Sequence, residues 1–150
     1  MIVVDTSVVY ALLDRRDGRH RQALSWSESF DGDLATTPLV LAETDHLASS
    51  RAGSEAARAF RRDVATGAYA VEWWRAAAAE RVEVAESYRD LGVSLTDASL
   101  VALAARIPTT TIATFDELHF RALRPARGGE AFRLLPADAG QQEPAIRAPQ

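Results

Sequence analysis

The chain has 150 residues, of which 47% are hydrophobic, and this length suits one compact domain with a single core. It contains no cysteine, and all 17 of its basic residues are arginine, so it has no lysine. Disulfides, thiolate metal sites, Schiff-base chemistry and a Walker-A phosphate loop are therefore excluded, while a net charge of −4 argues against a surface built generally for nucleic acid.

Short apolar strands alternate with helices in the first half of the chain. The β-branched run Ile2–Val4 is typical of a buried strand. Pro38 suits the first turn of a helix, because the N–H that it lacks is not needed there. Strands are predicted at residues 2–4, 34–36 and 69–73, and helices at residues 7–14, 20–30, 38–50 and 54–66.

The second half continues this alternation and ends in a segment without periodicity. Helices are predicted at residues 75–91 and 96–106, with Thr96 as the cap of the second, and a short one begins near Asp116. The apolar stripe of the first consists of Ala78, Val82, Ala85, Tyr88 and Leu91. Strands are predicted at residues 110–113 and 131–135. Polar and small residues then dominate, so we expect one domain at residues 1–136 and a disordered tail at 137–150.

Strands that alternate with helices predict an α/β sandwich with a mostly parallel sheet. In such sheets, ligands bind outside the carboxyl ends of the strands. Asp5 directly follows the first strand, and Asp116 follows the strand at residues 110–113 after two residues. We therefore expect both carboxylates at the same edge of the sheet.

Two further acids lie within apolar helical patterns. Leu39 and Leu47 lie four residues before and after Glu43, so the spacing predicts that this carboxylate shares a buried helix face. Asp97 is followed by apolar residues at three, four and seven positions, which predicts the same setting. A structural interpretation remains open for each acid. The three aspartates, including Asp5 and Asp116, can cap helices, and Glu43 can pair with a buried arginine.

Four carboxylates at one edge of a sheet repel one another, and their pKa values rise unless a cation lies among them. The chain has no lysine to supply that charge. Oxygen ligands without cysteine favour Mg²⁺, or alternatively Mn²⁺, over zinc or copper. The sequence therefore predicts a hard metal ion in a partly dry site, with Asp5 as one of its ligands.

Four segments of the chain resemble the PIN-domain ribonucleases, and most of all the VapC-type toxins of bacterial toxin–antitoxin pairs. The segments are "VVDTSVVYALL", "TTPLVLAETDHL", "LTDASLVALAARI" and "IATFDELHF", the last followed by "FRLLP". The resemblance covers residues 1 to about 136, with the motifs in the family's order. It implies a PIN-like α/β/α sandwich and an endoribonuclease that acts on tRNA or ribosomal RNA. It also implies a homodimer and a cognate antitoxin that inserts a segment into or beside the acidic cleft.

Carried over by motif, the family's acidic quartet falls on Asp5, Glu43, Asp97 and Asp116. We expect Asp5 and Asp97 to be the principal metal ligands, with the other two completing the site or binding through water. A metal-bound water would attack the phosphorus in line and leave a 5′-phosphate and a 3′-hydroxyl. Whether one or two ions act is left open. The hydroxyl residues expected to orient carboxylates or waters are Thr6, Ser7 and Thr114.

Arginines around the cleft are expected to attract the RNA phosphates. The candidates lie in the loop after the first helix and in a late loop, and they are Arg15, Arg16, Arg19, Arg124 and Arg127. A second group, Arg58, Arg61 and Arg62, is better explained as a solvated helix face. Trp73 and Trp74 are given no role, and the three histidines, which lack metal-ligand spacing, are expected to be structural.

Three alternatives remain beside the toxin. The first is a PIN-fold nuclease that processes RNA outside a toxin–antitoxin pair. The second is a Mg²⁺-dependent phosphatase, but that chemistry needs a second aspartate two residues after the first, where this chain has Ser7, and usually a lysine. The third, a binding module without catalysis, leaves Glu43 and Asp97 unexplained. No apolar run reaches 18 residues and no basic leader precedes the first strand, so we expect a cytoplasmic protein without a membrane span.

Overall fold

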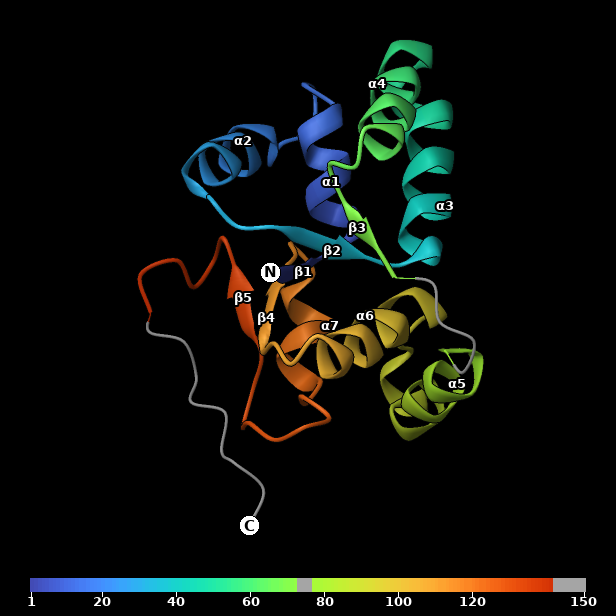
Figure 1. Cartoon of the computed structure of the whole chain (residues 1–150), viewed down its shortest axis with the longest axis vertical. Helices are drawn as coiled ribbons and strands as arrows, with labels where there is room; N and C mark the ends of the chain where they lie inside the picture. The colour runs from blue at the N-terminus through green and yellow to red at the C-terminus, as the bar shows by residue number, and fades with distance from the viewer. Residues whose placement is uncertain (73–76, 142–150) are drawn as a thin grey trace.

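The computed structural model describes residues 1–72 and 77–141 (Figure 1). Its centre is a five-stranded sheet in the order β3-β2-β1-β4-β5, and all neighbouring strands pair in parallel. The central strand β1 aligns Val3 with Ala35 on one side and with Ile112 on the other. The strands are β1 (Ile2–Val4), β2 (Leu34–Thr36), β3 (Ala70–Val71), β4 (Thr111–Ala113) and β5 (Arg133–Leu135).

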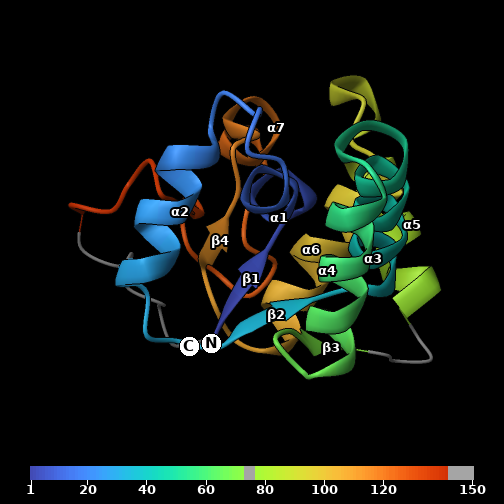
Figure 2. The same ribbon diagram turned by 90° about the horizontal axis from the view of Figure 1, so that it is seen from above.

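Helices cover both faces of this sheet, which confirms the predicted α/β/α sandwich (Figures 1 and 2). The helices are α1 (Thr6–Leu13), α2 (His20–Ser29), α3 (Pro38–Leu47), α4 (Ser54–Ala65), α5 (Ala77–Ser87), α6 (Leu95–Arg106) and α7 (Glu117–Ala122). Because successive strand residues point to opposite faces, Ile2 and Val4 join one core with Val8 and Phe60, while Val3 joins the other. The second core includes Leu100 of α6, Phe120 of α7 and Leu134 of β5.

The ends of several helices differ from the predictions by a cap or a turn. After α3, a π-helical turn (Ala48–Ala52) carries the chain to Gly53, whose φ of 100° ends it. Ser94 caps α6, so the prediction of Thr96 as the cap was wrong by two residues. The predicted strand at residues 69–73 is observed at Ala70–Val71, while Trp73 and Trp74 lie outside the described residues.

The apolar stripe predicted for residues 75–91 does not match the buried face. Val82 is 50% exposed and Leu91 is 45% exposed. Tyr88 of the predicted stripe does pack against the core, but Val84 packs there in place of Val82, and a 3₁₀ turn (Arg89–Leu91) redirects the chain after α5 ends at Ser87. The alanine-rich sequence of this helix allows more than one apolar face, so spacing alone did not identify the buried one. The side chain of Ala78 lies outside the described residues.

Packing continues beyond Pro136, where the predicted domain ended. The side chain of Asp138 is buried and accepts hydrogen bonds from both terminal nitrogens of Arg121, at 2.7 and 2.8 Å. It also accepts one from the backbone N–H of Leu134 at 2.8 Å. These contacts connect the segment after β5 to α7. The rest of the predicted tail, residues 142–150, lies outside the described part of the chain.

Candidate active site

Asp5 is a buried carboxylate at the carboxyl end of β1, where it also caps α1. Its Oδ2 accepts hydrogen bonds from Ser7 Oγ at 2.6 Å, from Thr114 Oγ1 at 2.9 Å and from the Ser7 N–H at 3.3 Å. Burial raises the pKa of the Asp5 carboxyl above its ordinary value, the hydrogen bonds oppose this rise, and the nearby Asp97 carboxylate adds to it. Among the described residues, no cation contributes to this shift and none forms an ion pair with Asp5, so this carboxylate is desolvated without a counter-ion in that part of the chain.

The two hydroxyls at Asp5 connect the turn after β1 to the turn after β4. Ser7 Oγ accepts from the backbone N–H of Phe115, and Thr114 Oγ1 accepts from that of Asp116, both at 2.9 Å. Each hydroxyl has one proton, and in both cases it is donated to Asp5. Both hydroxyl protons are therefore directed to Asp5 Oδ2, and the Thr114 hydroxyl brings the backbone of Asp116 beside Asp5, as the parallel topology predicts.

Asp116 caps α7 and contacts a histidine that the sequence did not bring into the site. Its Oδ1 accepts from the backbone N–H of His119 at 3.1 Å, and its Oδ2 accepts from His119 Nδ1 at 2.8 Å. The hydrogen bond to Asp116 raises the pKa of His119 most, burial opposes it, and the charge of Asp97 raises it further. The sequence did contain a signal for this contact, because His119 follows the helix-capping residue Asp116 by three positions.

Asp97 lies in the first turn of α6, where it acts as part of the cap and is half-exposed, so the prediction that it lies on a buried helix face was wrong. Its Oδ2 accepts from Ser94 Oγ at 2.8 Å and from the Ser94 N–H at 3.1 Å, which completes a capping box. Its charge nevertheless raises the pKa values of both Asp5 and His119. The cap therefore holds Asp97 near the other acids.

Glu43 is exposed, so the prediction that it lies on a buried helix face was wrong. Leu39 and Leu47 on the same face are only half-buried, because α3 buries the neighbouring face instead. That buried face consists of Val40, Thr44 and Ala48. Glu43 Oε2 accepts a hydrogen bond of 2.6 Å from Thr6 Oγ1, which brings this carboxylate to the turn that follows Asp5.

The four acids predicted from the sequence lie toward the carboxyl edge of the sheet, but their hydrogen bonds connect them only indirectly. Hydrogen bonds connect Asp5 to the Asp116 turn and Glu43 to Thr6, and Asp97 acts electrostatically on Asp5. Within residues 1–72 and 77–141, however, no three acidic or histidine side chains are close enough to hold one metal ion. The metal site therefore stays a prediction from the chemistry of the donors.

The donors themselves fit a hard cation. In Asp5, Asp97 and Glu43, the hydrogen bonds from described residues reach only one carboxylate oxygen and leave the other for a ligand. All of these ligand atoms are oxygen, as Mg²⁺ and Mn²⁺ prefer. A buried carboxylate with a raised pKa and no counter-ion, such as Asp5, is the group that gains most from such an ion.

The loop between α1 and α2 carries three of the arginines predicted to bind RNA, and two of them have clear contacts. Arg16 donates to Asp14 Oδ1 at 3.0 Å through Nε and to the carbonyl of Arg51 at 2.6 Å, and it helps to lower the pKa of Asp14 to about 2. It therefore connects this loop to the end of the π-helical turn. The guanidinium of Arg19 lies 5.1 Å from the ring centroid of Phe115, the residue before Asp116.

The two late arginines lie away from the acids. Arg127 lines a small cavity together with Thr109 and Thr110, which precede β4, at the opposite end of the strand from Asp116. Arg124, which follows α7, donates to backbone carbonyls at the end of that helix. Arg15 is exposed. Of the five predicted arginines, Arg19 is placed beside the candidate site by its contact with the Phe115 ring.

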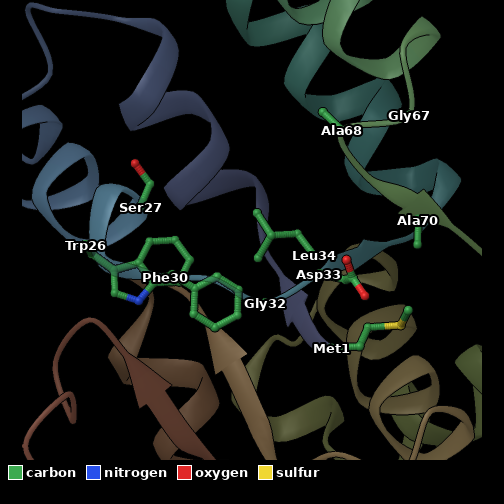
Figure 3. A pocket seen from close by; sticks show the side chains of 10 residues that line it. All are labelled: Met1, Trp26, Ser27, Phe30, Gly32, Asp33, Leu34, Gly67, Ala68 and Ala70. Atoms are coloured by element: carbon green, nitrogen blue, oxygen red, sulfur yellow. The ribbon is translucent and has the colours of Figure 1, made fainter.

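A cavity of about 430 Å³ opens at the amino ends of β1, β2 and β3, at the opposite edge of the sheet from the acids. Figure 3 shows the rings of Trp26 and Phe30 on one side of it and Ala70 on the other, with Met1 and Leu34 between them. Because it contains none of the four acids, it is not part of the candidate active site. Among the described residues, no helix is long and apolar enough to cross a bilayer.

Comparison with known families assigns the chain to one group of proteins. Residues 2–124 match the model of the PIN domain. This chain belongs to the PIN-domain family. Within it, the chain is 35% identical over 136 residues to the ribonuclease VapC26 of Mycobacterium tuberculosis, a match that covers 90% of this chain and all of that protein. The resemblance to VapC-type PIN proteins that was inferred from the sequence is confirmed.

Two solved structures have a similar fold. The crystal structure of VapC20 of M. tuberculosis, a toxin that cleaves the sarcin–ricin loop, superposes with a TM-score of 0.73 at 26% identity and covers 78% of this chain and 91% of its own. FitAcB of Neisseria gonorrhoeae superposes with a TM-score of 0.57 at 17% identity and covers 78% of this chain and 88% of its own. The second likeness supports the fold alone.

Proposed function

We propose that this PIN protein is a Mg²⁺-dependent endoribonuclease that acts as the toxin of a toxin–antitoxin pair. The observation that carries the proposal is Asp5, a buried carboxyl group whose Oδ2 accepts from Ser7 and Thr114 and which has no ion-pair partner among the described residues. Such an arrangement costs free energy in a protein without a ligand, which argues for a function in binding a cation. The ribonuclease VapC26 and the toxin VapC20 support the same class of activity.

In this proposal, Asp5 and Asp97 are the principal ligands of Mg²⁺, or of Mn²⁺ in its place, and Glu43 and Asp116 complete the site. When bound, the ion lowers the pKa of a water and offsets negative charge on the phosphate. Ser7 and Thr114 keep the carboxylate of Asp5 fixed, and Thr6 does the same for Glu43. The Thr114 hydroxyl also holds the backbone at Asp116, so that the turn after β4 cannot move independently of Asp5.

The proposed substrate is a structured RNA. VapC20 cleaves the sarcin–ricin loop, so a ribosomal RNA loop is one candidate, and tRNA is the other. We further propose a cytoplasmic homodimer that is inhibited by a cognate antitoxin bound into or beside the acidic edge. Coexpression with the protein from the neighbouring reading frame tests the antitoxin, and sedimentation velocity tests the dimer.

The activity is tested with the purified chain on sarcin–ricin loop RNA and on tRNA, with Mg²⁺ and then with EDTA. We expect cleavage to 5′-phosphate and 3′-hydroxyl ends that stops with EDTA and in Asp5→Asn. Asp31→Asn, which removes an exposed acid away from the site, is the matched control and should cleave normally. Cleavage that persists in both EDTA and Asp5→Asn would contradict the metal mechanism.

The alternatives give different results in the same assays. A nuclease of RNA processing would cleave RNA but would not arrest growth when induced, and it would not be inhibited by a neighbouring protein. A phosphatase would release phosphate from a phosphomonoester and leave RNA intact. A phosphatase would need an acid at position 7, and Ser7 there already donates its proton to Asp5 and accepts from the Phe115 N–H. A binding module would retain RNA without cleaving it.

A further inference from the structure

Arg19 lies at the rim of the acidic site without joining it. Its guanidinium lies 5.1 Å from the centre of the Phe115 ring, and Phe115 stands between Thr114 and Asp116. This contact joins the loop between α1 and α2 to the turn that precedes α7, although almost a hundred residues separate them. This contact is the point at which the arginine-rich loop reaches the candidate site.

The backbone of Arg19 is held in place before any substrate arrives. Its N–H donates to Asp17 Oδ1 at 2.7 Å, and its carbonyl accepts from Ala23 in the first turn of α2 at 2.9 Å. The next residue, His20, donates from Nδ1 to the carbonyl of Ala11 at 2.7 Å, which fixes the start of α2 on α1. The loop is therefore preorganised, and a ligand would have to order only the side chain of Arg19.

The Phe115 ring is fixed from the other side. The backbone N–H of Phe115 donates to Ser7 Oγ, the hydroxyl that also donates to Asp5. The ring of Phe115 packs against the core that includes Val8. A continuous series of contacts thus runs from Asp5 through Ser7 and Phe115 to Arg19. A movement of the ring would move both the guanidinium and the turn that carries Asp116.

The charge of Arg19 is directed to a neutral ring, although four carboxylates lie at the same edge of the sheet. Among the described residues, its guanidinium forms no ion pair with an acid, whereas Arg16 is bound to Asp14 and Arg61 to Asp45. A cation–π contact stabilises the position of a guanidinium while its N–H groups remain able to donate to an anion. This is the arrangement expected for a side chain that binds phosphate next to an acidic cleft.

We propose that Arg19 binds a backbone phosphate that flanks the scissile one in the RNA, and that Phe115 positions its guanidinium. The inference rests on the proposed ribonuclease function, and it assigns the phosphate contact to one of the predicted arginines. Arg16 instead stabilises the loop, and Arg124 and Arg127 lie elsewhere. The contact is made equally to substrate and transition state, so it contributes to KM rather than to kcat.

The test compares Arg19→Ala, Arg19→Lys and Phe115→Leu with Arg21→Ala, an exposed arginine that removes the same charge two residues away. In Arg19→Ala, KM should rise about tenfold, as expected for one lost charge-assisted hydrogen bond, with kcat nearly unchanged. Arg19→Lys should recover part of the loss, because lysine keeps the charge but not the planar fork. Phe115→Leu should give an intermediate KM, and Arg21→Ala should resemble the wild type.

A second measurement uses RNA binding in an Asp5→Asn background, where no cleavage is expected. The slope of log K against log salt concentration should become shallower by about 0.7 in Arg19→Ala, as for one lost phosphate contact on a single strand, and should not change in Arg21→Ala. Equal effects of both alanine variants, or an unchanged slope in Arg19→Ala, would overturn the proposal. Absence of cleavage by the wild-type chain would instead refute the ribonuclease function, while the binding data would still decide the role of Arg19.

Discussion

Thr114→Val is the substitution that tests most directly how the acids are held. Thr114 is fully buried, and valine keeps its shape while removing the hydroxyl. Two hydrogen bonds disappear at once, the one donated to Asp5 at 2.9 Å and the one accepted from the Asp116 N–H at 2.9 Å. Asp5 keeps only its bonds from Ser7, and the backbone N–H of Asp116 loses its acceptor.

The magnitude follows from the two bonds. A hydrogen bond to a charged group contributes about 1.5–3 kcal/mol, and a neutral one about 0.5–1.5 kcal/mol. Because Asp116 is only partly buried, water can replace part of the second, and we expect the free energy of unfolding to fall by about 2–4 kcal/mol in total. For a chain of this length, 2 kcal/mol corresponds to roughly 4–8 °C in Tm.

Urea denaturation without metal gives the stability change, and Mg²⁺ titration of RNA cleavage gives the functional one. The pKa of Asp5 should rise further above its ordinary value when a donor is lost, so cleavage by Thr114→Val should need more Mg²⁺ and a higher pH. Thr114→Ser, which keeps the hydroxyl, should restore the pH profile. If Thr114→Val changed stability by less than about 1 kcal/mol and left the pH profile intact, the hydroxyl would not hold Asp5 as argued here.

Three further predictions concern other carboxylates. Asp5→Asn should abolish cleavage but raise Tm without metal. Because the pKa of Asp5 is raised in the folded state, the stability of the wild type should fall as pH rises through that pKa. Urea titrations of the variant at several pH values should lack this slope. Asp138→Ala should cost about 2 kcal/mol in urea denaturation, less than a fully buried pair because Arg121 is half-exposed. Since the pKa of Asp138 is lowered, its contribution should be lost as pH falls through that value, and only in the wild type. Glu43→Gln should change the free energy of unfolding by no more than about 0.5 kcal/mol, because Glu43 is exposed. Cleavage by this variant should nevertheless need a higher Mg²⁺ concentration.

Much of the fold was predictable because strand and helix signals agreed with the final topology. The runs at Ile2–Val4 and Leu34–Thr36 are observed with the predicted bounds, and a parallel sheet requires Asp5 and Asp116 to share an edge. Glu43 was harder to place, since α3 has two adjacent faces with similar apolar content and the choice depends on how the helix tilts on its neighbours. Asp138 was missed because composition reports the average of a segment, whereas one buried ion pair is enough to order it.

Capping and metal binding, the two interpretations that the sequence left open, do not exclude each other in this topology. In a parallel sheet the chain leaves each strand at the carboxyl edge and starts the next helix there, so N-terminal caps and catalytic carboxylates occupy the same places. Asp5 caps α1, Asp97 closes the capping box of α6 and Asp116 caps α7, and all three lie at that edge. What distinguishes Asp5 is burial. A cap needs only an oxygen that faces an N–H, and a half-exposed carboxylate such as Asp97 satisfies it at little cost. Desolvation does not improve a cap, and no described residue neutralises Asp5, so we propose that its burial serves to bind a cation, which capping does not supply.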